Sequence, residues 1–298
     1  MNKLGIFINL WERNWDVDHI KYIKKVSAIG YDILEFQAQP LLEMSHIRMD
    51  EIKKCASDYN IELTYSLGLD PRYDVSSSSA TIRKKGIEYL QRIVERVGYM
   101  NGKIISGVSY GGWGISAGTD YNKIDLVNRS LDSMRKIVKT AENYGVQYCV
   151  ECVNRFESPI INTAQEALDY IAQIESDNIG ILLDTYHMNI EEVSIGDAIR
   201  LVNSKLTNFH TGENNRSIPG MGMGHLNWDE IFAALKDINY RGPIISEPFV
   251  AMGGEVGRDI HVWRNLIEPT ENNFDRGAKI LLDFEKEMLI KYRMGNQP

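Results

Sequence analysis

Apolar runs and amphipathic stretches alternate eight times along the chain. Each apolar run has the length of a strand, and each amphipathic stretch has the spacing of a helix with one buried face. Several runs, such as 179–183, lack polar alternation, which is typical of strands buried on both faces of a parallel sheet. The predicted strands are 3–10, 33–37, 61–68, 103–110, 147–154, 179–185, 206–212 and 243–250. The predicted helices are 16–29, 48–59, 82–99, 122–144, 163–175, 194–203, 228–238 and 272–291.

Eight strand–helix units in series predict an α/β fold, a (β/α)₈ TIM barrel with the active site at the C-terminal ends of the strands. An open doubly wound sheet is the alternative, but no G-x-G-x-x-G motif follows the first strand. The longer connections follow strand ends on that active-site face: 69–81, 111–121, 213–227 and 251–271. No linker or composition break divides the chain, so we predict one domain over 1–298.

Residues that suit helix ends support this assignment. Short polar residues that suit N-caps precede three predicted helices: Asp16, Thr163 and Asn227. Glycines that suit a left-handed C-terminal position follow three predicted helices: Gly30, Gly145 and Gly242.

The composition is ordinary for a soluble globular protein, with 43% hydrophobic and 25% charged residues. A balance of 33 basic to 41 acidic residues gives a net charge of −8, which repels phosphate backbones and anionic membrane surfaces. We therefore expect neither nucleic-acid nor membrane partners. The apolar run from Leu4 to Trp11 is too short to span a bilayer and has no small-residue cleavage site, so a cytoplasmic protein is expected.

Three cysteines, Cys55, Cys149 and Cys152, do not make a disulfide framework. Cys149 and Cys152 form a C-x-x-C pair, but a redox pair of that kind lies at a helix N-terminus. On a strand, an offset of three residues directs the two thiols to opposite faces, so we interpret them as structural.

Four consecutive predicted strands each carry one potential metal ligand near the C-terminal end: Glu151, Asp184, His210 and Glu247. In a barrel these side chains converge on one opening. A single such acid is more often a loop cap or an ion-pair partner. Four together would cost several kcal/mol per unpaired charge in a pocket, and a shared cation removes that cost. The oxygen-rich set suits Mn²⁺, Co²⁺ or Mg²⁺.

Further polar groups follow these ligand candidates along the chain: Asn154, Arg155, Glu157, His187, Glu213 and Arg216. Arg216 either holds a ligand oxygen or pairs with Glu213, and His187 is either a second polar contact or a buried core histidine. Four aromatic residues near strand ends either form an apolar wall for a sugar or pack in the core: Phe7, Trp11, Trp113 and Phe249. Gly253, Gly254 and Arg258 follow the eighth strand, where barrels often bind phosphate, but one arginine is thin support.

Four segments resemble the ketose 3-epimerases, the D-tagatose and D-psicose (D-allulose) 3-epimerase group of the xylose-isomerase-like barrels. They are 150–157 (VECVNRFE), 183–192 (LDTYHMNIEE), 210–216 (HTGENNR) and 246–250 (SEPFV), and the resemblance extends from Lys3 to Arg264. It implies that Glu151, Asp184, His210 and Glu247 bind one Mn²⁺-type ion.

The resemblance also implies that Glu157, His187 and Arg216 hold the O1–O3 end of a ketose, and that Trp113 and Phe7 form its apolar pocket. Phe249 and Ser66 are further candidates for substrate contacts. Residues 66–69 and 73–74 look more like the tagatose-type member. The loop between Pro219 and Trp228 is about two residues longer than the family spacing, and Ser246 replaces the usual Met.

As a hypothesis, the metal chelates O2 and O3 of the open-chain ketose, and one of Glu151 and Glu247 removes the C3 proton. The other carboxylate returns a proton to the opposite face of a cis-enediolate that Arg216 helps to stabilise. An aldose–ketose isomerase or a sugar dehydratase would use the same metal, and a non-catalytic sugar-binding protein is the alternative from another class. We also expect a homo-oligomer, a dimer or a tetramer.

Overall fold

The computed structural model describes residues 2–294 and is a closed barrel of eight parallel strands. The sheet closes because β1 pairs with β8 as well as with β2. This arrangement confirms the predicted (β/α)₈ fold and excludes the open doubly wound sheet. The strands are β1 (Leu4–Phe7), β2 (Ile33–Gln37), β3 (Glu62–Gly68), β4 (Ile104–Val108), β5 (Gln147–Cys152), β6 (Ile179–Asp184), β7 (Leu206–Thr211) and β8 (Ile244–Ser246).

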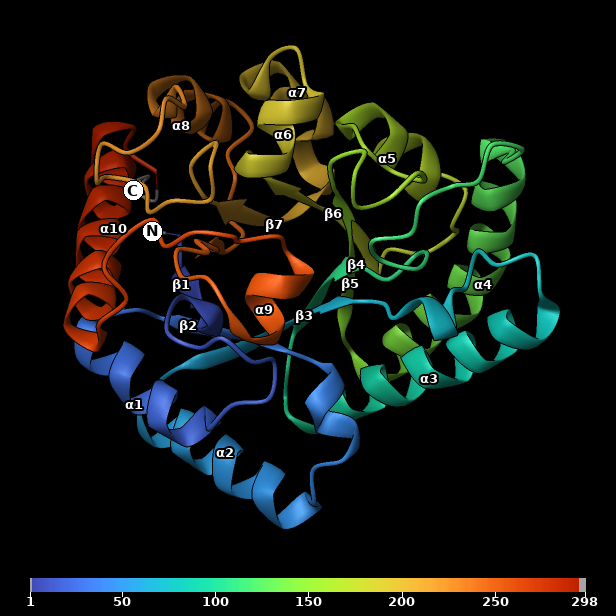
Figure 1. Cartoon of the computed structure of the whole chain (residues 1–298), viewed down its shortest axis with the longest axis horizontal. Coiled ribbons are helices and arrows are strands. Elements are labelled where there is room, and N and C mark those ends of the chain that lie inside the picture. The colour runs from blue at the N-terminus through green and yellow to red at the C-terminus, as the bar shows by residue number, and fades with distance from the viewer. Residues whose placement is uncertain (1, 295–298) are drawn as a thin grey trace.

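The helices form a ring outside the sheet, in which α10 lies between α8 and α1 (Figure 1). The eight predicted helices are present as α1 (His19–Ile29), α2 (His46–Asp58), α3 (Ala80–Tyr99), α4 (Lys123–Tyr144), α5 (Ala164–Ile171), α7 (Ile195–Val202), α8 (Trp228–Asp237) and α10 (Glu271–Lys291). Two short helices were not predicted, α6 (Thr185–Glu191) and α9 (Gly254–Asp259). Short 3₁₀ turns lie at 8–10, 39–42, 71–73 and 203–205.

The main core lies between the sheet and the helix ring. Aliphatic strand residues such as Ile181 and Leu183 are fully buried against helix residues such as Ile199. Burial on both faces explains why the strands lack polar alternation. None of the helices within 2–294 combines the length and the hydropathy needed to cross a bilayer.

The helix ends agree with the predictions in part. Thr163 and Asn227 are N-caps, and Gly30 and Gly145 end their helices in the left-handed conformation. The prediction for Asp16 is wrong, because Asp18 accepts the capping hydrogen bond from the backbone N–H of Ile20. The prediction for Gly242 is also wrong: the left-handed residue after α8 is Asn239, with φ of 53°.

The prediction that the thiols of Cys149 and Cys152 point to opposite faces of their strand is confirmed. Cys152 faces outward, with Sγ 3.5 Å from the carbonyl oxygen of Thr163, whereas Cys149 lies inside the barrel beside Ser106. Burial raises the pKa of both thiols. All three cysteines are buried and free, so neither thiol of the pair is placed for redox exchange.

The register between β6 and β7 shifts after Ile181, where Thr207 has no partner in the ladder. Such an extra residue re-aims the side chains that follow it. As a result Asp184 pairs directly with His210, which brings two of the candidate ligands together.

Candidate active site

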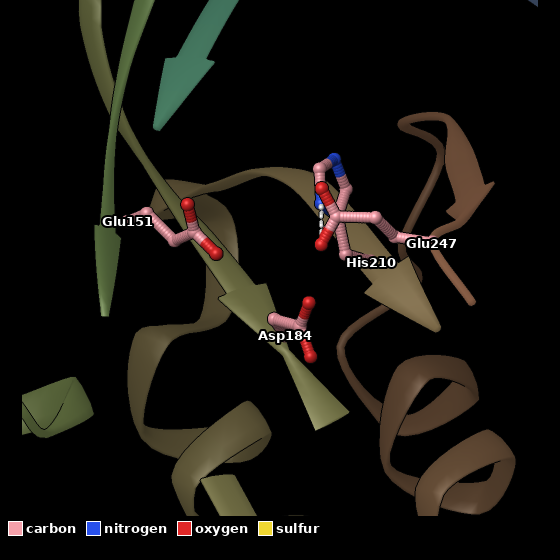
Figure 2. A group of neighbouring side chains, drawn as sticks. All are labelled: Glu151, Asp184, His210 and Glu247. Atoms are coloured by element: carbon pink, nitrogen blue, oxygen red, sulfur yellow. Dashed lines mark ion pairs between the residues drawn. The ribbon is translucent and has the colours of Figure 1, made fainter. Parts of the chain in front are cut away.

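The side chains of Glu151, Asp184, His210 and Glu247 meet at the C-terminal end of the barrel. One ligand atom from each lies within 4.8 Å of the corresponding atom of every other. Figure 2 shows Glu151 and Glu247 on opposite sides of the group, with Asp184 between the two strands that carry them and His210 beside Glu247. Two oxygens on opposite sides of one ion stand about 4 to 5 Å apart, so this spacing fits a shared divalent cation.

The donor set also fits a divalent ion chemically. Three carboxylates and one imidazole are largely removed from water, and the buried Nδ1 of His210 has no hydrogen-bond partner among the described residues. Burial first, and then the charge of Glu247, raises the pKa of Glu151 well above its ordinary value. The same two causes raise the pKa of Asp184, although nearby His187 opposes them. A cation at this position would relieve the repulsion among the acids.

His210 is oriented by a residue that the sequence analysis missed. Glu35 on β2 is completely buried, and its Oε1 lies 3.0 Å from Nε2 of His210. The hydroxyl of Thr64 donates to the other oxygen of Glu35 at 2.8 Å. Burial lowers the pKa of His210, but Glu35 and Glu247 outweigh it and raise that pKa well above the ordinary value. With a divalent ion bound, Nδ1 would have to be unprotonated to act as the ligand atom, and the remaining ring proton on Nε2 would lie on the side of Glu35.

Glu157 lies beside the ligand group, and each of its two oxygens already accepts at least one hydrogen bond. Its Oε2 accepts a hydrogen bond from the indole of Trp113 at 2.8 Å, and its Oε1 accepts from Asn154 at 3.0 Å and from Arg216 at 3.3 Å. Burial raises the pKa of Glu157, but nearby His187, the charge of Arg216 and the hydrogen bonds from Trp113 and Asn154 outweigh it and lower the pKa to about 2. Glu157 is consequently a fixed negative charge.

His187 lies in the first turn of α6 and directs one ring nitrogen into the site. Its Nδ1 accepts a hydrogen bond from the backbone N–H of Asn154 at 3.1 Å, so the ring proton lies on Nε2. Nε2 is 3.6 Å from Glu151 and 3.3 Å from Arg216. Burial lowers the pKa of His187, so the ring is neutral and offers an N–H donor to a ligand oxygen.

Arg216 spans the site between two acids. Its guanidinium contacts Glu157 and Glu247, each at 3.3 Å, and lies 4.0 Å from the ring centre of Tyr186. The suggested pairing with Glu213 is wrong, because Glu213 accepts from the indole of Trp228 instead. The backbone of Arg216 has a φ of 62°, a strained conformation that is common where a side chain is held for function.

The aromatic candidates divide into two groups. Trp113 and Phe249 line the same cleft as Ser66, Glu151 and Glu247. Trp113 packs so closely on Gly68 that an added Cβ there would lie 2.5 Å from the ring, so this position requires glycine. Phe7 packs behind Phe249, with ring centroids 5.8 Å apart. Trp11 packs beside Tyr22 and donates a hydrogen bond from its indole to Asp275, so it does not reach the site.

Two further predictions concern exposed arginines. Arg155 pairs with Glu191 and does not enter the cleft. Arg258 pairs with Asp259 at 2.7 Å, and Gly253 and Gly254 start the six-residue helix α9. The one arginine that the sequence suggested for a phosphate is therefore already paired.

Comparison with known proteins places this chain in the family that the four sequence segments resemble. Residues 23–279 match the family described as xylose isomerase-like TIM barrel. A D-psicose 3-epimerase of Ruminiclostridium cellulolyticum is 42% identical over 96% of this chain and 98% of its own length. A D-psicose 3-epimerase of Agrobacterium fabrum is 37% identical, with 96% and 99% covered. An L-ribulose 3-epimerase of Mesorhizobium japonicum is 30% identical, with 89% and 88% covered.

A solved structure shows the same fold in detail. The crystal structure of D-psicose 3-epimerase with D-tagatose from Clostridium cellulolyticum H10 superposes with a TM-score of 0.93 at 42% identity. The superposition covers 96% of this chain and 99% of that one. The likeness of residues 66–74 to a tagatose-type member stays a prediction.

Proposed function

This chain belongs to the ketose 3-epimerases of the xylose isomerase-like TIM barrel family, and from that premise we propose that it inverts C3 of a free ketose of the D-tagatose, D-fructose or D-psicose type. The observation that carries the proposal is the placement of Glu151 and Glu247 on opposite sides of one buried cluster. Inversion at a carbon needs one base on each face of a planar intermediate, and these two carboxylates supply them.

Glu151, Asp184, His210 and Glu247 would hold one divalent ion, with Mn²⁺ preferred and Co²⁺ or Mg²⁺ as alternatives. When bound, the ion polarises the C2 carbonyl and makes the C3 proton more acidic. Glu247 or Glu151 removes that proton from one face of the sugar. The second residue, which enters the step as a neutral carboxylic acid, delivers its proton to the other face of the cis-enediolate. This gives the inverted alcohol and leaves each residue in the protonation state that the other had at the start.

The remaining polar groups position the sugar and balance its charge. Arg216 already contacts Glu247, so its guanidinium lies where negative charge develops on the enediolate. The Nε2–H of His187 and the carboxylate of Glu157 offer one donor and one acceptor to the hydroxyl groups at the O1–O3 end. Trp113 and Phe249 line the cleft and exclude water from the apolar face of the sugar.

We expect Glu151→Gln and Glu247→Gln each to lower kcat by at least about 10³-fold, because removing one acid–base partner prevents complete inversion. Binding of the ketose should survive, since glutamine keeps the shape and a hydrogen-bonding oxygen. Turnover of D-psicose, D-fructose and D-tagatose is measured with Mn²⁺, Co²⁺ and Mg²⁺, and binding by calorimetry. Arg155→Gln, which changes an exposed ion pair outside the cleft, is the control. Full activity in either glutamate variant would contradict the acid–base roles.

A further inference from the structure

The active-site cleft opens into a second, much larger chamber. The cleft at the metal-ligand candidates has a volume of about 40 Å³, whereas the adjoining chamber has a volume of about 800 Å³. The two share Trp15, Gln37, Gly68 and Trp113 as lining residues. They are therefore continuous, with Trp113 between the reacting end and the outer space.

The small inner volume limits which part of a sugar can lie there. A cleft of about 40 Å³ has room for roughly three water molecules, or for the few polar atoms at the reacting end of a ketose. The carbons beyond C3 must extend past Trp113 into the chamber. The chamber is as large as pockets that hold whole drug-sized ligands, so the remainder of a six-carbon ketose leaves most of it unfilled.

The chamber wall has the aromatic surfaces that bind sugar rings. Tyr73 and Tyr89 stack face to face with ring centroids 4.0 Å apart, and both line the chamber. Trp15, which also lines the chamber, meets Trp113 edge to face with ring centroids 6.4 Å apart and donates its indole N–H to Asp259. Flat rings beside carboxylates suit a neutral polyhydroxylated ligand, which packs its C–H face on the rings and donates its hydroxyl groups to the acids.

The charge of the chamber disfavours a phosphate there. Four carboxylates line it, from Asp16, Asp70, Glu255 and Asp259, against the guanidinium groups of Arg72 and Arg258. Both arginines are already paired, Arg72 with Asp70 at 2.6 Å and Arg258 with Asp259 at 2.7 Å. The net field is negative, so a doubly charged phosphate on the far end of the ketose is repelled.

We propose that this chamber is a subsite for a neutral glycosyl group, so that the enzyme epimerises ketoses that carry a second sugar at the end away from C3. The inference rests on the proposed function, since it takes the reacting end of the ketose to lie at Glu151 and Glu247. It names the substrate class as free and glycosylated ketoses, and it places phosphorylated ketoses among the poor substrates.

The test compares three substrates: D-fructose, D-fructose with a glucosyl group on O6, and D-fructose 6-phosphate. For the wild-type protein loaded with Mn²⁺, kcat/KM for the glucosyl ketose should lie within about tenfold of the value for D-fructose. The value for the phosphate should be at least about tenfold lower than for D-fructose at low salt. That gap should narrow at about 0.5 M salt, because screening weakens the repulsion.

Two variants locate the effect. Tyr89→Ala removes one ring of the stacked pair and should lower kcat/KM for the glucosyl ketose about three- to tenfold, with D-fructose changed less than about twofold. Asp16→Trp fills the chamber at an exposed position and should block only the glucosyl ketose. The matched control is Tyr121→Ala, an exposed tyrosine that does not line the chamber, and it should change neither value.

One outcome would overturn the subsite and leave the proposed function intact. In it the protein turns over D-fructose, but kcat/KM for the glucosyl ketose is less than about one-hundredth of the value for D-fructose. Equal losses for both substrates in Tyr89→Ala would overturn it as well. Failure to turn over any of the ketoses would instead refute the proposed function, and this inference with it.

Discussion

Glu35 is the residue whose role depends most on the three-dimensional structure. It is fully buried on β2, holds the hydroxyl of Thr64 at 2.8 Å and faces His210 at 3.0 Å. A carboxylate behind a histidine fixes the ring orientation and makes the other ring nitrogen a better ligand. Glu35 therefore acts through His210 and is a positioning residue.

Replacing Glu35 by glutamine should weaken metal binding about 10- to 100-fold, since the carboxylate that orients His210 loses its charge. Titration calorimetry of Mn²⁺ into the metal-free protein measures this directly, without reference to activity. Glu285→Gln is a matched control, because Glu285 is equally buried but contacts Thr211 and Ser246 instead of a ligand candidate. An unchanged dissociation constant in Glu35→Gln would show that Glu35 serves packing alone.

Single functional residues were predictable where the local sequence pattern marks them. Glu151, Asp184, His210 and Glu247 each end an apolar strand, and the structure brings them together. Glu35 lies inside the segment ILEFQ, a single acid among mostly apolar residues. Nothing in the neighbouring sequence indicates that its partner is a histidine on a distant strand. The contact of Arg216 with Glu157 was likewise unpredictable, because it depends on how the loops after β5 and β7 fold together.

At the scale of elements, α10 is joined to the barrel by a buried acid. Glu285 accepts hydrogen bonds from Thr211 on β7 at 2.6 Å and from Ser246 on β8 at 3.0 Å. Burial raises the pKa of Glu285 from 4.5 to about 8, although both hydroxyl groups oppose the shift. The folded protein thus binds a proton that the unfolded chain releases between these pH values, so this group lowers stability as pH rises from about 4.5 to 8.

Glu285→Gln keeps the neutral shape and removes this titration. The variant should match the wild type near pH 5 and exceed its stability near pH 9 by a few kcal/mol, about 2 to 5. Urea unfolding of both proteins at several pH values measures the difference. Parallel pH profiles for the two proteins would show that Glu285 does not titrate in this window.

Element prediction was accurate where the pattern was long and failed where it was short. The long amphipathic stretches predicted α3, α4 and α10 to within two residues. The seven residues of α6 follow β6 without a loop, because Asp184 ends the strand and caps the helix by accepting from the N–H of Tyr186 at 2.7 Å. Helix α9 has only six residues, too few to show a helical period.

At the scale of the whole molecule, eight repeated units were enough to predict a closed barrel, since parallel strands with short crossovers have few alternatives. The sequence also placed the long loops on the face that holds the site. It could not show the chamber beside the cleft, which is assembled from six separate segments that include Trp15, Gln37, Tyr73, Tyr89, Trp113 and Glu255. The homo-oligomer expected from the sequence stays a prediction.

The central claim is that two carboxylates exchange the proton on C3 of a ketose. Proton NMR of D-psicose incubated with the Mn²⁺-loaded protein in D₂O tests it most directly, because a carboxylate that returns a proton to the opposite face takes it from solvent. We expect D-fructose as the product with deuterium at C3 and none at C1. Product with protium at C3, or an aldose or dehydrated sugar in place of the ketose, would contradict the account.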